Sequence, residues 1–242
     1  MARVLIRIPN WLGDAVMASA AVAAYAAAHP QDSLALLGIP LTMSVFEHTP
    51  FPCTRIPYDR KGVHAGIGGM VRLSRELRSF QFETAYLLTN SFSSALIPWL
   101  AGIPRRVGTV GHWKRALLTD SVVFPEAYAH QAQRYAFLLN GAFPESLRPV
   151  IFLSEAERQT YGEKLCALAE SRPCIALAAG AAYGSAKRWL PERFAALARH
   201  CAQEWDARVL LLGSAQEAPL LEWIQEQAGE GTLSLAGKTT LR

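Results

Sequence analysis

The stretch that decides the fold is Val4-Leu5-Ile6-Arg7-Ile8, followed directly by Pro9-Asn10-Trp11-Leu12-Gly13-Asp14. The first five residues form a short apolar, β-branched run, and the next six contain the turn formers proline, asparagine and glycine. An alanine-rich segment with high helix propensity comes next, from Ala15 to Ala28. The order strand, loop, helix predicts the opening of a parallel βα unit.

Outward from this stretch, short apolar runs and helical patterns alternate along the first half of the chain. Met70, Leu73, Leu77 and Phe80 recur at three- and four-residue steps, which predicts an amphipathic helix. Residues 95–100 repeat this pattern less cleanly. Further strands are predicted at 34–37, 54–56, 84–88 and 106–108. Strands that alternate with helices indicate an α/β fold with a doubly wound parallel sheet.

The same alternation restarts in the second half. Strands are predicted at 174–178, 209–213 and 234–236, and a helix is predicted to begin at Pro191, since proline suits a first-turn position. The apolar stripe of this helix is Phe194, Leu197, Ala198, Cys201 and Trp205. We therefore expect a first domain at 1–150, a linker at 151–172 and a second domain at 173–242. The second domain is expected to be truncated, because domains of this class have about five or six strands.

Composition sets limits on the class of protein. The chain has 242 residues, 51% of them hydrophobic, and a net charge of +4 from 24 Lys plus Arg against 20 Asp plus Glu. This favours anionic partners, and we expect none of them to be a nucleic acid. No apolar run reaches the roughly 18 residues of a membrane span, and no secretory signal pattern is present, so the expected location is the cytosol.

The four cysteines are Cys53, Cys166, Cys174 and Cys201. They form no CxxC pair and have no histidine at metal-ligand spacing, so we expect buried thiols and no metal site. An Asp-x-Asp pair that could hold a metal-bound sugar nucleotide is also missing from the sequence, which favours metal-independent chemistry. No cofactor is expected.

The first turn is a candidate active site, because ligands bind at the carboxyl ends of strands in a doubly wound sheet. Gly13 would let the backbone come close to a ligand. Asp14 has two interpretations. It can cap the helix or offset the helix dipole, or it can act as a general base that takes a proton from a sugar hydroxyl.

A second candidate site is the loop from Ala179 to Trp189, which lies between a predicted strand and a predicted helix. Its small residues Gly180 and Ala181 expose backbone N–H groups, and Lys187 and Arg188 add positive charge beside them. Such a loop can bind phosphate, and the alternative is a solvated basic turn.

Two nucleotide-binding alternatives are weaker. Gly237-Lys238-Thr239-Thr240 resembles the end of a Walker A loop, but the glycine that should lie five residues before Gly237 is Thr232. The first turn has no GxGxxG, and the strand that ends at Gly38 has no acidic residue for a ribose, so a nicotinamide enzyme is disfavoured.

Basic residues cluster in the first half, and each alone is typical of a solvated surface. Arg105 and Arg106 follow a predicted turn at 102–104, and loops at that edge can face a ligand cleft. Together with other cations they would hold an acceptor that carries phosphates and carboxylates. The cluster consists of Arg55, Arg60, Lys61, Arg72, Arg75, Arg78, Arg105, Arg106, Lys114 and Arg115.

Several segments together resemble a known family. They are Gly13-Asp14, the block Leu87–Pro98 that contains Asn90-Ser91-Phe92, Ala101–Gly108, Ala179–Pro191, Val209–Ser214 and Leu235-Ala236-Gly237. With these residues the chain is similar, over nearly all its length, to the lipopolysaccharide heptosyltransferases of glycosyltransferase family nine, and within them to the heptosyltransferase II group. A later Asp-Ser-Gly-x-Met-His segment of the family has no counterpart in this sequence.

The resemblance implies a GT-B architecture, with two Rossmann-like domains, the first for the acceptor and the second for ADP-heptose. It implies inverting transfer of L-glycero-D-manno-heptose to the inner-core heptose of lipid A-core oligosaccharide, at the cytoplasmic face of the inner membrane. Asp14 matches the catalytic base. The implied donor-binding residues are Gly180, Ala181, Lys187, Gly213, Ser214, Leu235 and Gly237. The implied acceptor-binding residues are Gly13, Asn90, Ser91, Arg60, Arg105 and Arg106.

Three other functions stay open from the sequence. The chain could be a non-catalytic module that binds an anionic glycolipid, it could have heptosyltransferase I-type specificity, or it could use another sugar nucleotide. Turnover of ADP-heptose separates the first of these from an enzyme.

Overall fold

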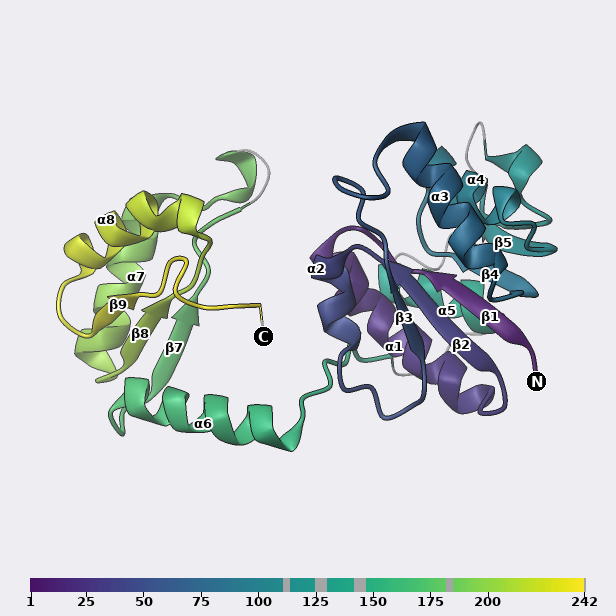
Figure 1. The fold of residues 1–242 in the computed structure, drawn as a ribbon. Coiled ribbons are helices and arrows are strands. Elements are labelled where there is room, and N and C mark those ends of the chain that lie inside the picture. Colours follow the sequence, from purple (N-terminus) through teal and green to yellow (C-terminus); the bar gives the residue numbers. More distant parts are fainter. Residues whose placement is uncertain (111–113, 125–129, 142–146, 182–184, 242) are drawn as a thin grey trace. The chain divides into compact units, whose positions relative to one another are not determined.

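The computed structural model describes residues 1–110, 114–124, 130–141, 147–181 and 185–241. They form two compact units, Met1–Leu153 and Ser154–Arg242 (Figure 1). The linker expected at 151–172 contains a helix, α6 (Glu155–Ala169), which belongs to the second unit. Within the described residues, no helix is long and apolar enough to cross a membrane.

The first unit is built on a six-stranded sheet in the order β3-β2-β1-β4-β5-β6, and all neighbouring strands are parallel. The chain adds β2 and β3 on one side of β1 and then adds β4, β5 and β6 on the other side, so β1 and β4 form the topological switch point of a doubly wound sheet. The strands are β1 (Arg3–Arg7), β2 (Ser33–Gly38), β3 (Thr54–Pro57), β4 (Thr84–Leu87), β5 (Arg105–Thr109) and β6 (Asp120–Val122).

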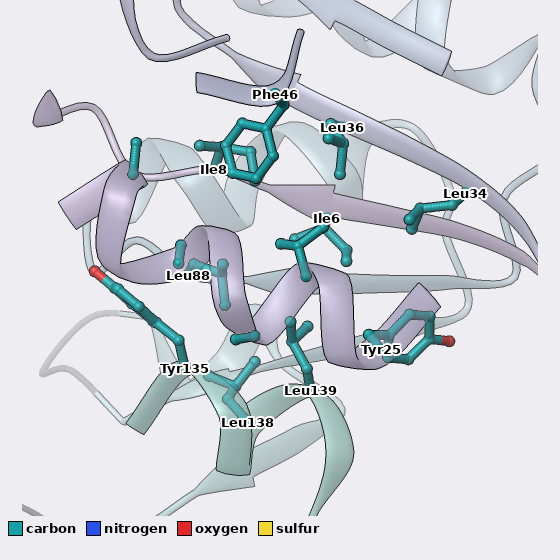
Figure 2. Close-up of a cluster of buried hydrophobic side chains, with 14 of the residues drawn as sticks. Ile6, Ile8, Tyr25, Leu34, Leu36, Phe46, Leu88, Tyr135, Leu138 and Leu139 are labelled. Atoms are coloured by element: carbon teal, nitrogen blue, oxygen red, sulfur yellow. The ribbon is translucent and has the colours of Figure 1, made fainter. Parts of the chain in front are cut away.

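Alternation along β1 divides the core into two layers. Val4, Ile6 and Ile8 point to one face and Leu5 to the other, as the two-residue period of a strand requires. The first face packs on α1 (Leu12–Ala28) and α5 (Gln131–Asn140), and Figure 2 shows this layer. The second face packs on α3 (Gly66–Arg78) and α4 (Phe92–Leu100). Short helical segments are α2 (Pro40–Met43), η1 (Ser44–Phe46) and η2 (Arg115–Leu117).

Alanine explains how α1 fits between the sheet and α5. Ala15, Ala18 and Ala21 are fully buried, and α1 packs directly on α5. Because a methyl group is the only side chain at these positions, the neighbouring elements can come close without a loss of packing density. The helix is apolar on nearly all sides, which is typical of a buried helix.

The second unit contains a three-stranded parallel sheet in the order β7-β8-β9. Its core joins Val209 and Leu211 to buried side chains of two helices, among them Cys201 and Leu221. The elements after α6 are β7 (Cys174–Leu177), η3 (Ser185–Lys187), α7 (Pro191–Glu204), β8 (Arg208–Leu211), η4 (Ala215–Glu217), α8 (Ala218–Ala228) and β9 (Thr232–Ser234).

Most predicted elements are present, and some details differ. Pro191 is at the first turn of α7, as expected. Phe80 and Trp205 lie beyond the last residues of their helices and are 39% and 57% exposed, so neither belongs to an apolar stripe. The expectation of buried thiols is wrong for Cys166 and Cys174, which are exposed, because α6 buries no side chain and β7 shows alternate residues to solvent.

Candidate active site

A cavity of about 400 Å³ lies at the switch point of the first sheet. The loop after β1 contributes Asn10 and Trp11, the first turn of α1 contributes Asp14, and the loop after β4 contributes residues 88–91. Gln131 and Tyr135 of α5 complete the lining. The cavity therefore brings Asp14 together with two of the expected acceptor residues, Asn90 and Ser91, at the place where doubly wound sheets bind ligands.

Asp14 lies in the first turn of α1 and is half-buried. The N-cap is Trp11, whose side chain makes no capping hydrogen bond, so Asp14 is not the cap. Its charge still offsets the helix dipole. A Cβ on the neighbouring Gly13 would meet no atom within 4 Å, so the space beside this turn is open. The carboxylate is thus placed in a cavity with room for a ligand.

The loop after β1 is anchored by a buried arginine that sequence reasoning missed. Arg7 is 3% exposed, and its Nη1 donates to the carbonyl oxygens of Ile8 at 2.7 Å and Leu37 at 3.0 Å. Nη2 donates to Asn10 Oδ1 at 2.8 Å, and the guanidinium lies over the Tyr58 ring. Burial lowers the pKa of Arg7 to about 10. The signal in the sequence is a charged residue inside an apolar strand.

The loop after β4 is held by a buried lysine. Lys114 is 2% exposed, and its Nζ donates to the Thr89 carbonyl oxygen at 2.6 Å. Ser94 Oγ donates to the same oxygen at 3.3 Å, and Asn90 Oδ1 accepts a hydrogen bond from Thr109. Burial lowers the pKa of Lys114 to about 8. These bonds fix the turn that presents Asn90 and Ser91 to the cavity.

Tyr135 is a further residue that sequence reasoning missed. Its side chain is almost fully buried, and its pKa is raised to about 12, first by burial and then by the negative charge of Asp14, while a hydrogen bond with the Gln131 side chain lowers it. The three- and four-residue spacing of Ala132, Tyr135, Ala136 and Leu139 is the signal that could have revealed α5.

The expected arginines do not join this cavity. Arg60 follows β3 and lines a separate cavity of about 370 Å³ with Tyr58 and Lys61. Arg105 and Arg106 begin β5, so they lie at the amino end of the parallel sheet and not at the edge that carries Asp14. Arg105 pairs with Asp120 at 3.5 Å, and Arg106 donates to the carbonyl oxygens of Leu117 and Pro104. Arg105 and Arg106 therefore do not face the cavity that contains Asp14, where they were expected to bind the acceptor.

In the second unit, expected donor residues gather around Glu217 at the carboxyl edge of the sheet. Ser214 N donates to Glu217 Oε2 at 2.8 Å and Ser214 Oγ donates to it at 2.9 Å, which lowers the pKa of the carboxyl. A Cβ on Gly180 would overlap this carboxylate, and one on Gly213 would lie 2.6 Å from Leu221 Cδ1. A side chain at Gly180 would therefore force the Glu217 carboxylate to move, and one at Gly213 would force Leu221 to move. Glu217 was missed from sequence.

The turn after β9 closes on the same edge. Gly237 N donates to the Gly213 carbonyl oxygen at 2.9 Å, and Leu235 N donates to Leu211 at 2.9 Å. Gly237 has a φ of +64°, which glycine adopts without strain. Lys238 Nζ lies 3.4 Å from the Ser234 carbonyl oxygen, so this lysine contacts its own turn.

The loop after β7 is described in part. Arg188 Nη2 donates to the Ala181 carbonyl oxygen at 3.1 Å, and Lys187 is exposed at the end of η3. Residues 182–184 of the predicted phosphate loop lie outside the described residues. The second unit thus brings Gly180, Gly213, Ser214, Leu235 and Gly237 to one edge, with Lys187 on the segment that follows Ala181.

Two parallel α/β units, the first with a carboxylate in a cavity and the second with glycine-rich turns at the carboxyl edge of its sheet, are the arrangement expected of a GT-B glycosyltransferase. The family model for glycosyltransferase family 9 (heptosyltransferase) matches residues 70–242. The chain belongs to this family, as the resemblance predicted, and it is a glycosyltransferase.

Known relatives agree with this assignment. Lipopolysaccharide heptosyltransferase 2 of Escherichia coli K12 is 30% identical over 99% of this chain and 72% of the relative. Lipooligosaccharide heptosyltransferase 2 of Haemophilus influenzae is 30% identical over 98% of this chain and 72% of its own length. The solved structure of E. coli ADP-heptose LPS heptosyltransferase II aligns with a TM-score of 0.82 at 29% identity, and covers 99% of this chain and 74% of that one. The predicted α/β GT-B fold is confirmed.

Proposed function

We propose that the protein transfers heptose from ADP-L-glycero-D-manno-heptose to the inner-core heptose of lipopolysaccharide, with inversion at the anomeric carbon. One observation carries the proposal: Asp14, Asn90 and Ser91 line one cavity at the switch point of the first sheet. The name of the solved E. coli relative, an ADP-heptose LPS heptosyltransferase, supports this choice of donor and acceptor.

In the proposed mechanism Asp14 is the general base. Its carboxylate takes the proton of the acceptor hydroxyl, whose oxygen attacks the anomeric carbon of the donor while the bond to ADP breaks. Asn90 and Ser91 hold the acceptor through hydrogen bonds. Arg60 is proposed to contact acceptor anions from its own cavity beside β3. The positions of Arg105 and Arg106 at the amino end of β5 weigh against an acceptor role for them.

The second unit is proposed to bind the donor. Gly180 and Ala181 expose backbone N–H groups, and Lys187 neutralises the diphosphate that leaves. Gly213, Ser214, Leu235 and Gly237 line the edge for the nucleotide. Glu217 supports this edge because its carboxylate accepts two hydrogen bonds from Ser214 and lies beside Gly180. No metal or cofactor takes part in the proposed reaction.

The test is a coupled assay of ADP release from ADP-heptose with mono-heptosylated lipid A, run on the parent chain and on Asp14→Asn. Release that requires the acceptor and falls in the variant supports the proposal. Acceptor binding without release favours the non-catalytic glycolipid-binding module. Release from a different sugar nucleotide, or with an acceptor that has no heptose, favours another donor or heptosyltransferase I-type specificity.

The acceptor also suggests where the protein works. We propose a cytoplasmic enzyme in peripheral contact with the inner membrane, since each Lys or Arg near an anionic leaflet contributes about 1 kcal/mol to binding. Co-sedimentation with vesicles that contain anionic phospholipid, compared with neutral vesicles, tests this contact. Equal recovery with both kinds of vesicle would argue against it.

A further inference from the structure

Tyr135 presents a polar atom to the cavity from an otherwise apolar position. The residue is 5% exposed and lies in α5, yet it lines the cavity that contains Asp14. Figure 2 shows the Tyr135 ring between α5 and α1, with its hydroxyl oxygen near the N-terminal end of α1. Tyr25 lies near the C-terminal end of the same helix. A buried phenol placed in this way has one end among alkyl groups and the other in the cavity.

The hydrogen bonding of Tyr135 decides what it can offer to a ligand. The phenol lies near the Gln131 side chain, which lowers its pKa, but burial and the charge of Asp14 raise the pKa by more. Burial and the charge of Asp14 keep the phenol protonated. A protonated phenol can donate a hydrogen bond to a ligand oxygen in the cavity that Tyr135 lines together with Asp14.

We infer that Tyr135 binds the acceptor sugar, with its hydroxyl donating a hydrogen bond to a sugar oxygen next to the hydroxyl that Asp14 deprotonates. This inference rests on the proposed function. It suits a polyhydroxyl ligand, because such a ligand offers one oxygen to a donor and a neighbouring O–H to a carboxylate. Tyr135 and Asp14 line the same cavity, so one ligand in that cavity can contact both side chains.

Tyr135→Phe tests the inference, because it removes one oxygen and keeps the ring in the core. The matched control is Tyr25→Phe, which removes a hydroxyl bonded to Asp32 at 3.1 Å at the other end of α1. We expect Tyr135→Phe to bind a de-acylated core oligosaccharide that ends in one heptose about 3- to 10-fold more weakly than the parent, the effect of one lost neutral hydrogen bond. Tyr25→Phe is expected to bind it like the parent. Calorimetric titration measures both, on protein shown to be folded by its thermal transition.

The outcomes separate this inference from the proposed function. Parent protein that binds the oligosaccharide, with Tyr135→Phe equal to it, overturns the role of Tyr135 and leaves the proposed function standing. Parent protein that does not bind it overturns the proposed function, and the inference falls with it. In the ADP-release assay, Tyr135→Phe should raise the KM for the acceptor and leave that for ADP-heptose unchanged. A loss confined to kcat would show that Tyr135 acts on Asp14 and not on the acceptor.

Discussion

At the scale of single residues, the chemistry depends on a carboxylate in the first turn of α1. Asp14→Asn keeps the shape of the side chain and removes the base, so we expect turnover to fall about 100- to 10,000-fold with little change in donor affinity. Steady-state release of ADP measures the fall. Asp32→Asn is a matched control, because Asp32 bonds Ala2 and Tyr25 away from the cavity. Equal turnover in Asp14→Asn and the parent would show that Asp14 only offsets the helix dipole and is not the base.

A second prediction at this scale concerns how the buried Lys114 makes stability depend on pH. Its pKa of about 8 in the folded protein is below its ordinary value of 10.5. Between these values the unfolded chain binds more protons than the folded one, so the free energy of unfolding should rise with pH. The rise from this group is at most about 3 kcal/mol, and at pH below 8 the full cost of the buried charge is present.

Urea denaturation at pH 7 to 10 checks this prediction. Lys114→Met keeps the length of the side chain and has no titrating group, so its stability should gain less between pH 8 and 10 than that of the parent. Other titrating groups cancel in the difference between the two proteins. Parallel pH dependences would show that Lys114 is not responsible.

At the scale of elements, the turns after β7 and β8 depend on glycine beside Glu217. A methyl group at Gly180 would overlap the Glu217 carboxylate. We expect Gly180→Ala to displace this edge and to weaken ADP binding about tenfold or more, with the fold of the first unit unchanged. Fluorescence titration with ADP measures the affinity.

The contact with Glu217 can be separated from an effect of alanine alone. In the double variant Gly180→Ala with Glu217→Ala the overlap is removed, so part of the lost affinity should return. Glu217→Ala by itself is the control for the lost bonds to Ser214. A double variant that binds ADP no better than Gly180→Ala would show that the carboxylate is not the cause.

At the scale of the whole molecule, each unit has its own sheet and its own core. Lys187→Ala should therefore weaken ADP-heptose binding through lost phosphate neutralisation and leave acceptor binding unchanged. Asp14→Asn should leave donor binding unchanged. Titrations of each variant with each ligand test this independence. Equal donor affinity in Lys187→Ala and the parent would remove Lys187 from the site.

The sequence by itself determined the local elements and the class of fold. A short apolar, β-branched run predicts β1, the steps of three and four predict α3, and Pro191 marks the start of α7, because these signals depend on a few neighbouring residues. The turn with Asp14 and the glycine-rich loop at Gly180 could be found for the same reason. The resemblance to a known family then gave their expected roles.

Only the tertiary structure decided which residues share the cavity. Asp14, Asn90 and Tyr135 are far apart in the chain and meet because β1 and β4 are neighbours at the switch point and α5 packs on α1. Arg105 and Arg106 begin β5, which runs parallel to β1 and β4, so they lie at the opposite end of the sheet. Strand order, helix docking and the burial of Arg7 and Lys114 depend on contacts between distant segments, which no local pattern specifies.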